Sequence, residues 1–293
     1  MWVLFAFGSA LFAGITAVLA KLGIEKTNSY LVTALRTVIV VLFAWLMVLV
    51  AGSFESIAEI SRKTFLFLIL SGLATGASWI CYFKALQMGD VNKVVSIDKS
   101  STILTMLFAF LFLKEGLSII KVLTMALMGT GTYLMLGRQH QKPNASDRKP
   151  EREKNGAWKI YALLSAAFAS LTAILGKVGI AGVESNLGTA IRTLVVLIMA
   201  WLMVFGLRKQ KEIKNIERRS WIFILLSGLT TGLSWLCYYR ALQDGPAGVV
   251  VPIDKLSILV TVFFSYFVLK EKLKKKAVLG LIFIVVGTLA LLI

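Results

Sequence analysis

The 293-residue chain is predicted to be an all-α membrane protein with ten transmembrane helices, arranged as two inverted five-helix repeats. Three observations lead to this class: an apolar composition, apolar runs of membrane length, and an internal duplication. The chain is 58% hydrophobic and 16% charged, with a mean hydropathy of +0.81. A soluble domain of this size carries more charge and shorter apolar runs.

Runs of about 18 or more mainly apolar residues indicate membrane-spanning helices. A helix also satisfies its own backbone hydrogen bonds, which the bilayer core requires. Ten such runs cover 2–20, 31–50, 65–84, 94–113, 118–136, 158–176, 187–206, 221–240, 250–269 and 276–293.

The second half of the chain repeats the first. An offset of 156 positions, the separation between Trp2 and Trp158, aligns the halves without a gap. The first repeat is predicted at 1–137, a polar, charged linker at 138–157 and the second repeat at 158–293. Because five spans is an odd number, the second repeat must enter the membrane from the opposite side. Inverted repeats are typical of secondary transporters, which bind substrate between the repeats.

The net charge of +17 falls mainly in short loops, so it predicts topology and contacts with lipid headgroups; nucleic acid is not an expected partner. Segment 51–64 has two basic residues, whereas its counterpart 207–220 has six. The positive-inside rule therefore predicts a multi-pass protein of the cytoplasmic (inner) membrane, with the linker in the cytoplasm and both termini outside. The six basic residues are Arg208, Lys209, Lys211, Lys214, Arg218 and Arg219.

Arg36 and Arg192 are candidate substrate-binding residues at equivalent positions of the second and seventh predicted spans. An ionisable side chain within a span usually faces the bundle interior or a water-filled cavity. Alternatively, an arginine near a helix end extends its side chain to the membrane surface. The sequence leaves both arrangements open. In the first, the two arginines can attract an anionic group.

Asp98 and Asp254 lie near the start of the fourth predicted span of each repeat. Ser101 and Ser257 follow three residues later, on the same helix face. A carboxylate at membrane depth can bind substrate or a coupling ion, carry a proton, or form a structural ion pair with one of the two arginines. The sequence does not decide between these roles.

Aromatic pairs precede both aspartates near the ends of the third spans: Trp79 with Tyr82, and Trp235 with Tyr238. Aromatic side chains at a membrane interface usually anchor the helix there. The alternative is that the four rings line a substrate cavity next to the aspartates.

Catalytic residues, cofactors and metals are not expected. The single histidine, His140, lies in the linker, and the two cysteines lie in apolar helices, where free cysteine behaves as a small hydrophobic residue. The chain is therefore not predicted to be an enzyme.

Three stretches of the second repeat resemble EamA-type carriers of the drug/metabolite transporter superfamily: "ALQDGPAGVVVPIDKLS" at 241–257, "VLKEKL" at 268–273 and "GTLALL" at 287–292. Pro252 and Glu271 match the family pattern, whereas the first repeat has Ser96 in place of the proline. The chain also resembles a fused pair of five-span bacterial and archaeal members.

This resemblance implies a ten-helix carrier that moves small organic metabolites such as amino acids by alternating access, commonly outward. Family members are often drawn with both termini in the cytoplasm, opposite to the charge-based prediction. We therefore expect a secondary active transporter, with proton coupling as one option, whose partners are a small-molecule substrate and the bilayer; monomer and homodimer both stay open. The alternatives are a passive channel or lipid scramblase, a non-transporting assembly subunit and a membrane enzyme.

Overall fold

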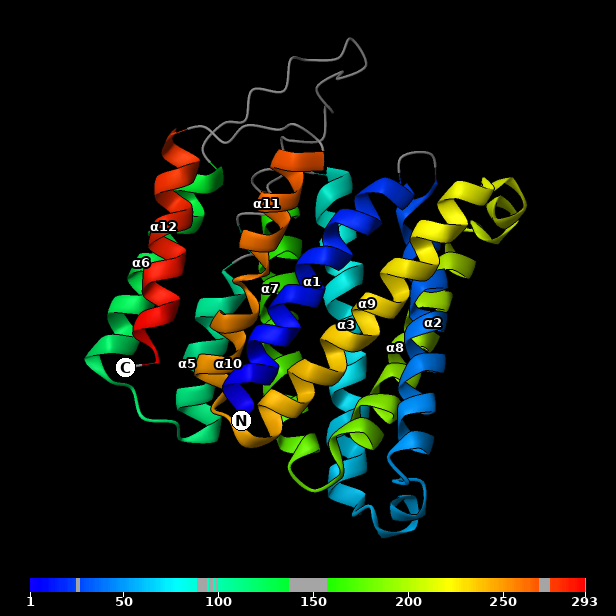
Figure 1. Cartoon of the computed structure of the whole chain (residues 1–293), viewed down its shortest axis with the longest axis horizontal. Helices are drawn as coiled ribbons and strands as arrows, with labels where there is room; N and C mark the ends of the chain where they lie inside the picture. The colour runs from blue at the N-terminus through cyan, green and yellow to red at the C-terminus, as the bar shows by residue number, and fades with distance from the viewer. Residues whose placement is uncertain are drawn as a thin grey trace. The chain divides into compact units, whose positions relative to one another are not determined.

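The structure is a computed structural model that describes residues 1–24, 27–88, 94, 97–98, 100–136, 157–268 and 275–292. Every regular element within these ranges is a helix, which confirms the all-α class (Figure 1). Residues 138–156 of the predicted linker, Ser96 and Glu271 lie outside the described residues.

The described helices follow the predicted spans in order. Each predicted span corresponds to one helix, except that 250–269 corresponds to two and that in 94–113 a turn at Ser100 precedes the described helix, which begins at Ser101. Seven described segments are long and apolar enough to cross a membrane. The helices are α1 (Trp2–Ile24), α2 (Ser29–Val50), α3 (Arg62–Met88), α5 (Ser101–Leu113), α6 (Ile119–Leu136), α7 (Ala157–Ile180), α8 (Ser185–Gly206), α9 (Arg218–Asp244), α10 (Ala247–Asp254), α11 (Ser257–Val268) and α12 (Lys275–Ala290), with short 3-10 turns η1 (Glu55–Glu59) and η3 (Gln210–Asn215).

Two compact units make up the chain, and each contains parts of both repeats. Unit 1 comprises Met1–Gly76 and Thr172–Glu271, and unit 2 comprises Ala77–Leu171 and Lys272–Ile293. Helices α3 and α7 each contribute to both units.

In unit 1, the equivalent helices α2 and α8 pack against each other in opposite directions. Ala44 and Val48, late in α2, share one apolar cluster with Leu187 and Ile191, early in α8. The short turns that follow these helices, η1 and η3, accordingly lie at opposite ends of α2 (Figure 1). Equivalent helices that pack antiparallel are related by an axis perpendicular to them, as inverted repeats require.

Unit 2 contains a second antiparallel pair of equivalent helices, α6 and α12, which lie side by side in Figure 1. The Thr124 hydroxyl, early in α6, donates to the carbonyl of Gly287, late in α12, at 2.9 Å. At the other end, a Cβ atom on Gly131 would lie 2.6 Å from the carbonyl oxygen of Gly280. Glycine at this position therefore lets the two backbones touch. Both units thus have the pairing expected of inverted repeats.

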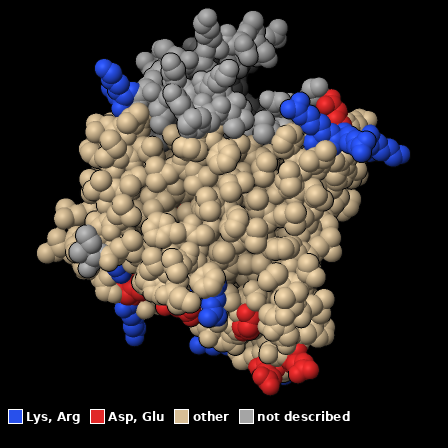
Figure 2. Space-filling model, viewed as in Figure 1, with Lys and Arg blue, Asp and Glu red and all other residues tan. Residues whose placement is uncertain are grey.

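The outward faces of the helices are apolar. Leu42 is 67% exposed on α2, and its equivalent on α8, Ile198, is 59% exposed. Figure 2 shows almost no charged atoms over the helices, and the charged side chains in view gather at helix ends. Such a surface suits contact with lipid tails, because lipid tails are as apolar as leucine and exposing leucine to them carries no hydrophobic cost.

The predicted continuous helix at 250–269 is interrupted at the aspartate. Helix α10 ends at Asp254 and α11 begins at Ser257, and the Leu256 amide donates to the carbonyl of Ile253 at 2.9 Å. The first repeat has the same turn, in which the Ser100 amide donates to the carbonyl of Ile97 at 3.0 Å. Since Ser96 stands where the second repeat has a proline, the interruption does not depend on proline.

Candidate substrate and coupling site

Arg192 lies on the buried face of α8 and is only 2% exposed. Two hydroxyl groups of α3 fix its guanidinium group. Nε donates to Ser71 Oγ at 3.0 Å, and Nη2 donates to Thr75 Oγ1 at 2.6 Å. Because Ser71 and Thr75 are four residues apart, they lie on the same face of α3 and can hold one planar group.

Two aromatic rings of α9 complete the surroundings of Arg192. The guanidinium carbon lies 5.2 Å from the ring centre of Trp235 and 4.6 Å from that of Tyr239. A cation over aromatic rings is stabilised by about 2 kcal/mol when water is excluded. We call Ser71, Thr75, Trp235 and Tyr239 the arginine cage. Of these four residues, only Trp235 was predicted from the sequence. Serine, threonine and tyrosine are common in apolar helices, so their presence does not indicate a binding site.

The guanidinium group of Arg192 is not fully satisfied. Nη1 is buried and has no hydrogen-bond partner, and Arg192 forms no ion pair among the described residues of unit 1. A buried cation without a counter-charge is unfavourable, and an unmade hydrogen bond to a charged group adds to this. The cage uses two of the five N–H donors, and both donors of Nη1 lack an acceptor among the described residues.

Arg36, the equivalent residue on α2, has different surroundings. Its side chain is half-buried, and no hydrogen bond or ion pair is found for it among the described residues of unit 1. Asp98 lies in unit 2, whereas both arginines lie in unit 1. The ion pair of Asp98 with an arginine therefore stays a prediction.

Asp254 lies at the interruption between α10 and α11 and is held by the first helix of the other repeat. Its Oδ1 atom accepts a hydrogen bond from Ser9 Oγ of α1 at 2.6 Å. Asp98 is held in the same way, because its Oδ1 atom accepts from Ser165 Oγ of α7 at 2.9 Å. Ser9 and Ser165 are equivalent residues, so each repeat donates to the aspartate of the other.

A second serine extends each contact. Ser234 Oγ lies 3.3 Å from Ser9 Oγ and donates to the backbone carbonyl of Ser9 at 3.1 Å. In unit 2, the equivalent Ser78 Oγ lies 3.3 Å from Ser165 Oγ and donates to its carbonyl at 3.0 Å. We call Ser234–Ser9–Asp254 the unit-1 triad and Ser78–Ser165–Asp98 the unit-2 triad.

Ser101 and Ser257 begin the helices that follow the aspartates, and their backbones make close contacts. The carbonyl of Ser101 accepts from the Ser170 hydroxyl at 2.8 Å. The carbonyl oxygen of Ser257 would lie 2.7 Å from a Cβ atom on Gly14, so glycine allows α1 to approach α11 closely.

The remaining predicted aromatic residues are divided between the units. Trp79 and Tyr82 lie in unit 2, where both are half-buried and Tyr82 packs on the apolar cluster of Ala85, Val94, Trp158 and Ala162. Tyr238 lies in unit 1 and meets the cage residue Tyr239 edge to face, with ring centres 5.2 Å apart.

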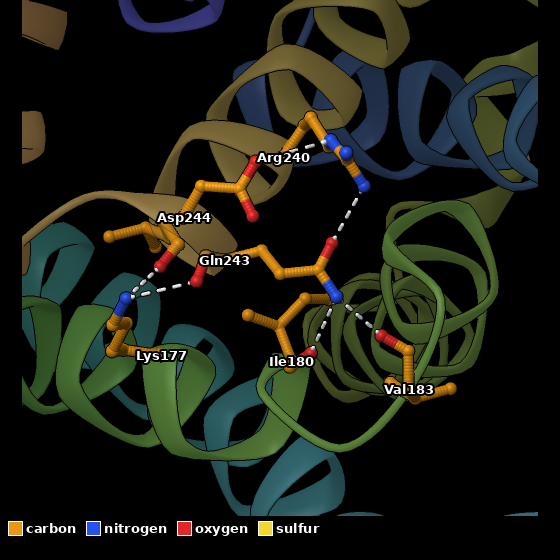
Figure 3. Close-up of polar contacts among 7 residues, drawn as sticks. Lys177, Ile180, Val183, Arg240, Gln243 and Asp244 are labelled. Carbon is orange, nitrogen blue, oxygen red and sulfur yellow. Dashed lines mark hydrogen bonds and ion pairs between the residues drawn. The ribbon is translucent and has the colours of Figure 1, made fainter. Parts of the chain in front are cut away.

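The C-terminal end of α9, which carries the cage aromatics and leads into α10, is fixed by side chains (Figure 3). Lys177 of α7 donates to the carbonyls of Leu242, Gln243 (3.2 Å) and Gly245 (2.8 Å). The Gln243 amide donates in turn to the carbonyls of Ile180 (3.2 Å) and Val183 (2.8 Å). A lysine is favourable there, because the last carbonyls of a helix lack partners and carry partial negative charge.

Within the described residues, no group of three or more His, Cys, Asp or Glu side chains could hold a metal ion. The buried polar side chains of the described helices are serine and threonine hydroxyls and Arg192, and Arg36, Asp98 and Asp254 are half-buried. Interrupted helices with charged groups inside an inverted-repeat bundle define the class of the protein as a membrane transporter.

The chain belongs to the EamA-like transporter family, a model of which matches residues 1–137 and 156–293. A relative from Sinorhizobium sp, named an uncharacterized transporter in the cobO 3' region, is 46% identical over 135 residues, which are 46% of this chain and 96% of that protein. The uncharacterized transporter YxxF of Bacillus subtilis (strain 168) is 25% identical over 223 residues, 75% of this chain and 67% of that protein.

A solved crystal structure of a protein aligns with 99% of this chain and 96% of its own, with a TM-score of 0.77 and 16% sequence identity. At this identity the likeness concerns the fold alone. The family resemblance inferred from the sequence is confirmed.

Proposed function

We propose that the protein is a secondary active transporter of small organic metabolites that carry a carboxylate, such as amino acids, and that it exports them from the cell by alternating access. The observation that carries this proposal is Nη1 of Arg192, which is buried and has no hydrogen-bond partner in the part of the chain that the structure describes. A carboxylate matches a guanidinium group in charge and geometry, and the two form strong paired hydrogen bonds.

The enclosure of Arg192 fits a carrier better than a channel. At 2% exposure, the arginine is reached by substrate only after the helices around the cage separate. Such a step belongs to alternating access, in which one arrangement of the helices closes before another opens. Trp235 and Tyr239 then offer apolar faces to the rest of the substrate molecule.

Asp98 and Asp254 are the proposed coupling groups. Each carboxylate lies at a helix interruption and can exchange a proton as the helices move. Export driven by an inward proton gradient needs only that one of them binds its proton from outside and releases it inside.

Ligand-dependent stabilisation of the purified protein tests the substrate class. Leucine and phenylalanine are compared with the matching α-amides leucinamide and phenylalaninamide, which lack the carboxylate. We expect at least one carboxylate compound to raise the unfolding temperature and its amide partner to have no effect; about 2.7 kcal/mol of stabilisation is expected at 100 times the dissociation constant. Equal responses to acids and amides throughout the panel would contradict the role of Arg192.

Proteoliposome assays then test the mechanism with the compound that stabilises the protein. A carrier shows saturation and counterflow, whereas a channel shows neither, and a membrane enzyme would change the compound chemically. At least one of the variants Asp98→Asn and Asp254→Asn is expected to remove proton-driven accumulation. Transport with wild-type pH dependence in both variants would exclude the coupling role.

A further inference from the structure

The two triads have matching geometry although they lie in different units and are built from different segments. In each, a serine of the first helix of one repeat donates to the aspartate of the other, at 2.6 Å in unit 1 and 2.9 Å in unit 2. In each, a serine of a third helix lies 3.3 Å from the first serine. Among the described residues of each unit, both arrangements place a neutral hydroxyl donor on the carboxylate.

The hydroxyl contact depends on the charge of the carboxylate. An ionised aspartate only accepts hydrogen bonds, and a bond to a charged acceptor is roughly twice as strong as a neutral one. A protonated aspartate has a donor of its own and no negative charge. Protonation therefore weakens the link between the first helix of one repeat and the interrupted helix of the other.

The charged and titratable groups around Asp254 come mainly from α9. Tyr238 and Tyr239 lie within electrostatic reach of both Asp254 and Arg192, and Lys255 follows in the chain. Residues 2–19 of α1 and 257–264 of α11 contain no titratable side chain. Ser9 is therefore the polar group that α1 offers to the carboxylate.

Around Asp98, Tyr82 of α3 lies within electrostatic reach. Lys159 and Tyr161 are the titratable residues at 157–171 of α7, and α5 has none. Ser165 thus has the same role on α7 as Ser9 has on α1.

We propose that Ser9 and Ser165 are positioning residues for proton coupling, each holding the ionised aspartate of the opposite repeat and releasing it when that aspartate binds a proton. The proposal rests on the proposed function, because it assigns the carboxylates as proton carriers. It adds the step by which protonation of an aspartate weakens its contact with α1 or α7. The serine at 9 or 165 acts through the aspartate and needs no contact with substrate.

Infrared titration of the purified protein in lipid nanodiscs tests this inference with protons alone, so no substrate is needed. The band of the protonated carboxyl group is assigned to Asp254 by its loss in Asp254→Asn. In Ser9→Ala, the pH midpoint of this band should rise by about one unit, because a hydrogen bond to the ionised form is lost. In Ser165→Ala, the band assigned through Asp98→Asn should move in the same direction.

Thr16→Val is the matched control for Ser9→Ala. Thr16 also lies on α1 and donates to a hydroxyl of α9, that of Thr230, at 2.8 Å, but touches no carboxylate. In Thr16→Val, the pH midpoint of the Asp254 band should equal that of the wild type. In Ser9→Ala, the midpoint of the Asp98 band should also be unchanged.

Two results overturn the inference in different ways. If neither serine variant moves the midpoint although both aspartate bands titrate, the positioning role is wrong and the coupling proposal stands. If neither aspartate band changes over the accessible pH range, the carboxylates do not carry protons and the coupling part of the proposed function is wrong as well. Variants that move both bands equally, or a Thr16→Val shift of the same size, would indicate a general structural effect and also contradict the inference.

Discussion

The two repeats share their aspartates but differ at their arginines. Asp98 and Asp254 each sit at a helix interruption and accept from an equivalent serine. Arg192, by contrast, is enclosed by hydroxyls and aromatic rings, whereas Arg36 is half-buried and has no comparable contact in the described part of unit 1. In the described residues, the two repeats thus share the serine–aspartate contact, whereas the hydroxyl contacts to an arginine are found for Arg192.

The two repeats differ in sequence at one cage residue and at the residue packed against it. Tyr239 corresponds to Phe83 of the first repeat, and Gly176, against which Tyr239 packs, corresponds to Ala20. The second repeat therefore has both a larger polar ring next to its arginine and the space to hold that ring. The first repeat has phenylalanine and alanine at these two positions.

The largest expected effect tests the inversion on which the comparison depends. Glu55 and Lys211 are equivalent and exposed, and they follow the antiparallel helices α2 and α8. In a background with both native cysteines replaced by alanine, Glu55→Cys should react with an impermeant maleimide added to intact cells, and Lys211→Cys should react only after the cells are opened. Reaction of both from one side would contradict the inversion; exchange of the two results would reverse the predicted orientation alone.

Substitution of the two arginines sharpens the comparison at the site. Arg192→Gln should weaken binding of the stabilising carboxylate compound by at least about 30-fold, since a buried charged hydrogen bond is worth about 2 kcal/mol. Arg36→Gln should weaken it by less than about tenfold, because a half-buried side chain is better screened by its surroundings. Isothermal titration measures both effects, with size-exclusion profiles to confirm folding. Equal losses in the two variants would show that the arginines act alike.

The smallest effect concerns the space behind Tyr239. A Cβ atom on Gly176 would lie 2.8 Å from the ring of Tyr239, which is itself only 2% exposed. Gly176→Ala, which introduces the residue found at the equivalent position, should lower the free energy of unfolding by about 1–3 kcal/mol, as overpacking usually does. Thermal unfolding in detergent measures the change. Gly206→Ala is the control, because nothing lies within 4 Å of its added Cβ atom; equal stability of the two variants would mean that Tyr239 moves freely.

Several features of the fold follow from sequence patterns that act locally. Apolar runs fix the spans, since lipid accepts only apolar helix surfaces and internally bonded backbone. Neither helix interruption was predicted: Pro252 lies near the one at Asp254, but Ser96 occupies the equivalent position near Asp98, so no shared proline marks the two turns. Ser9 and Ser165 were missed, since a serine in an apolar helix usually bonds to its own backbone and gives no sign of a distant partner.

The sequence by itself determined the helical membrane class, the duplication and, through an odd number of spans, the inversion, because hydropathy and periodicity are properties of neighbouring residues. Only the tertiary structure decided that two hydroxyl groups hold Arg192, whereas no such bond to Arg36 is found in the described part of unit 1, and that each aspartate is held by the opposite repeat. Those outcomes depend on contacts between residues 67 to 245 positions apart, which no local pattern specifies.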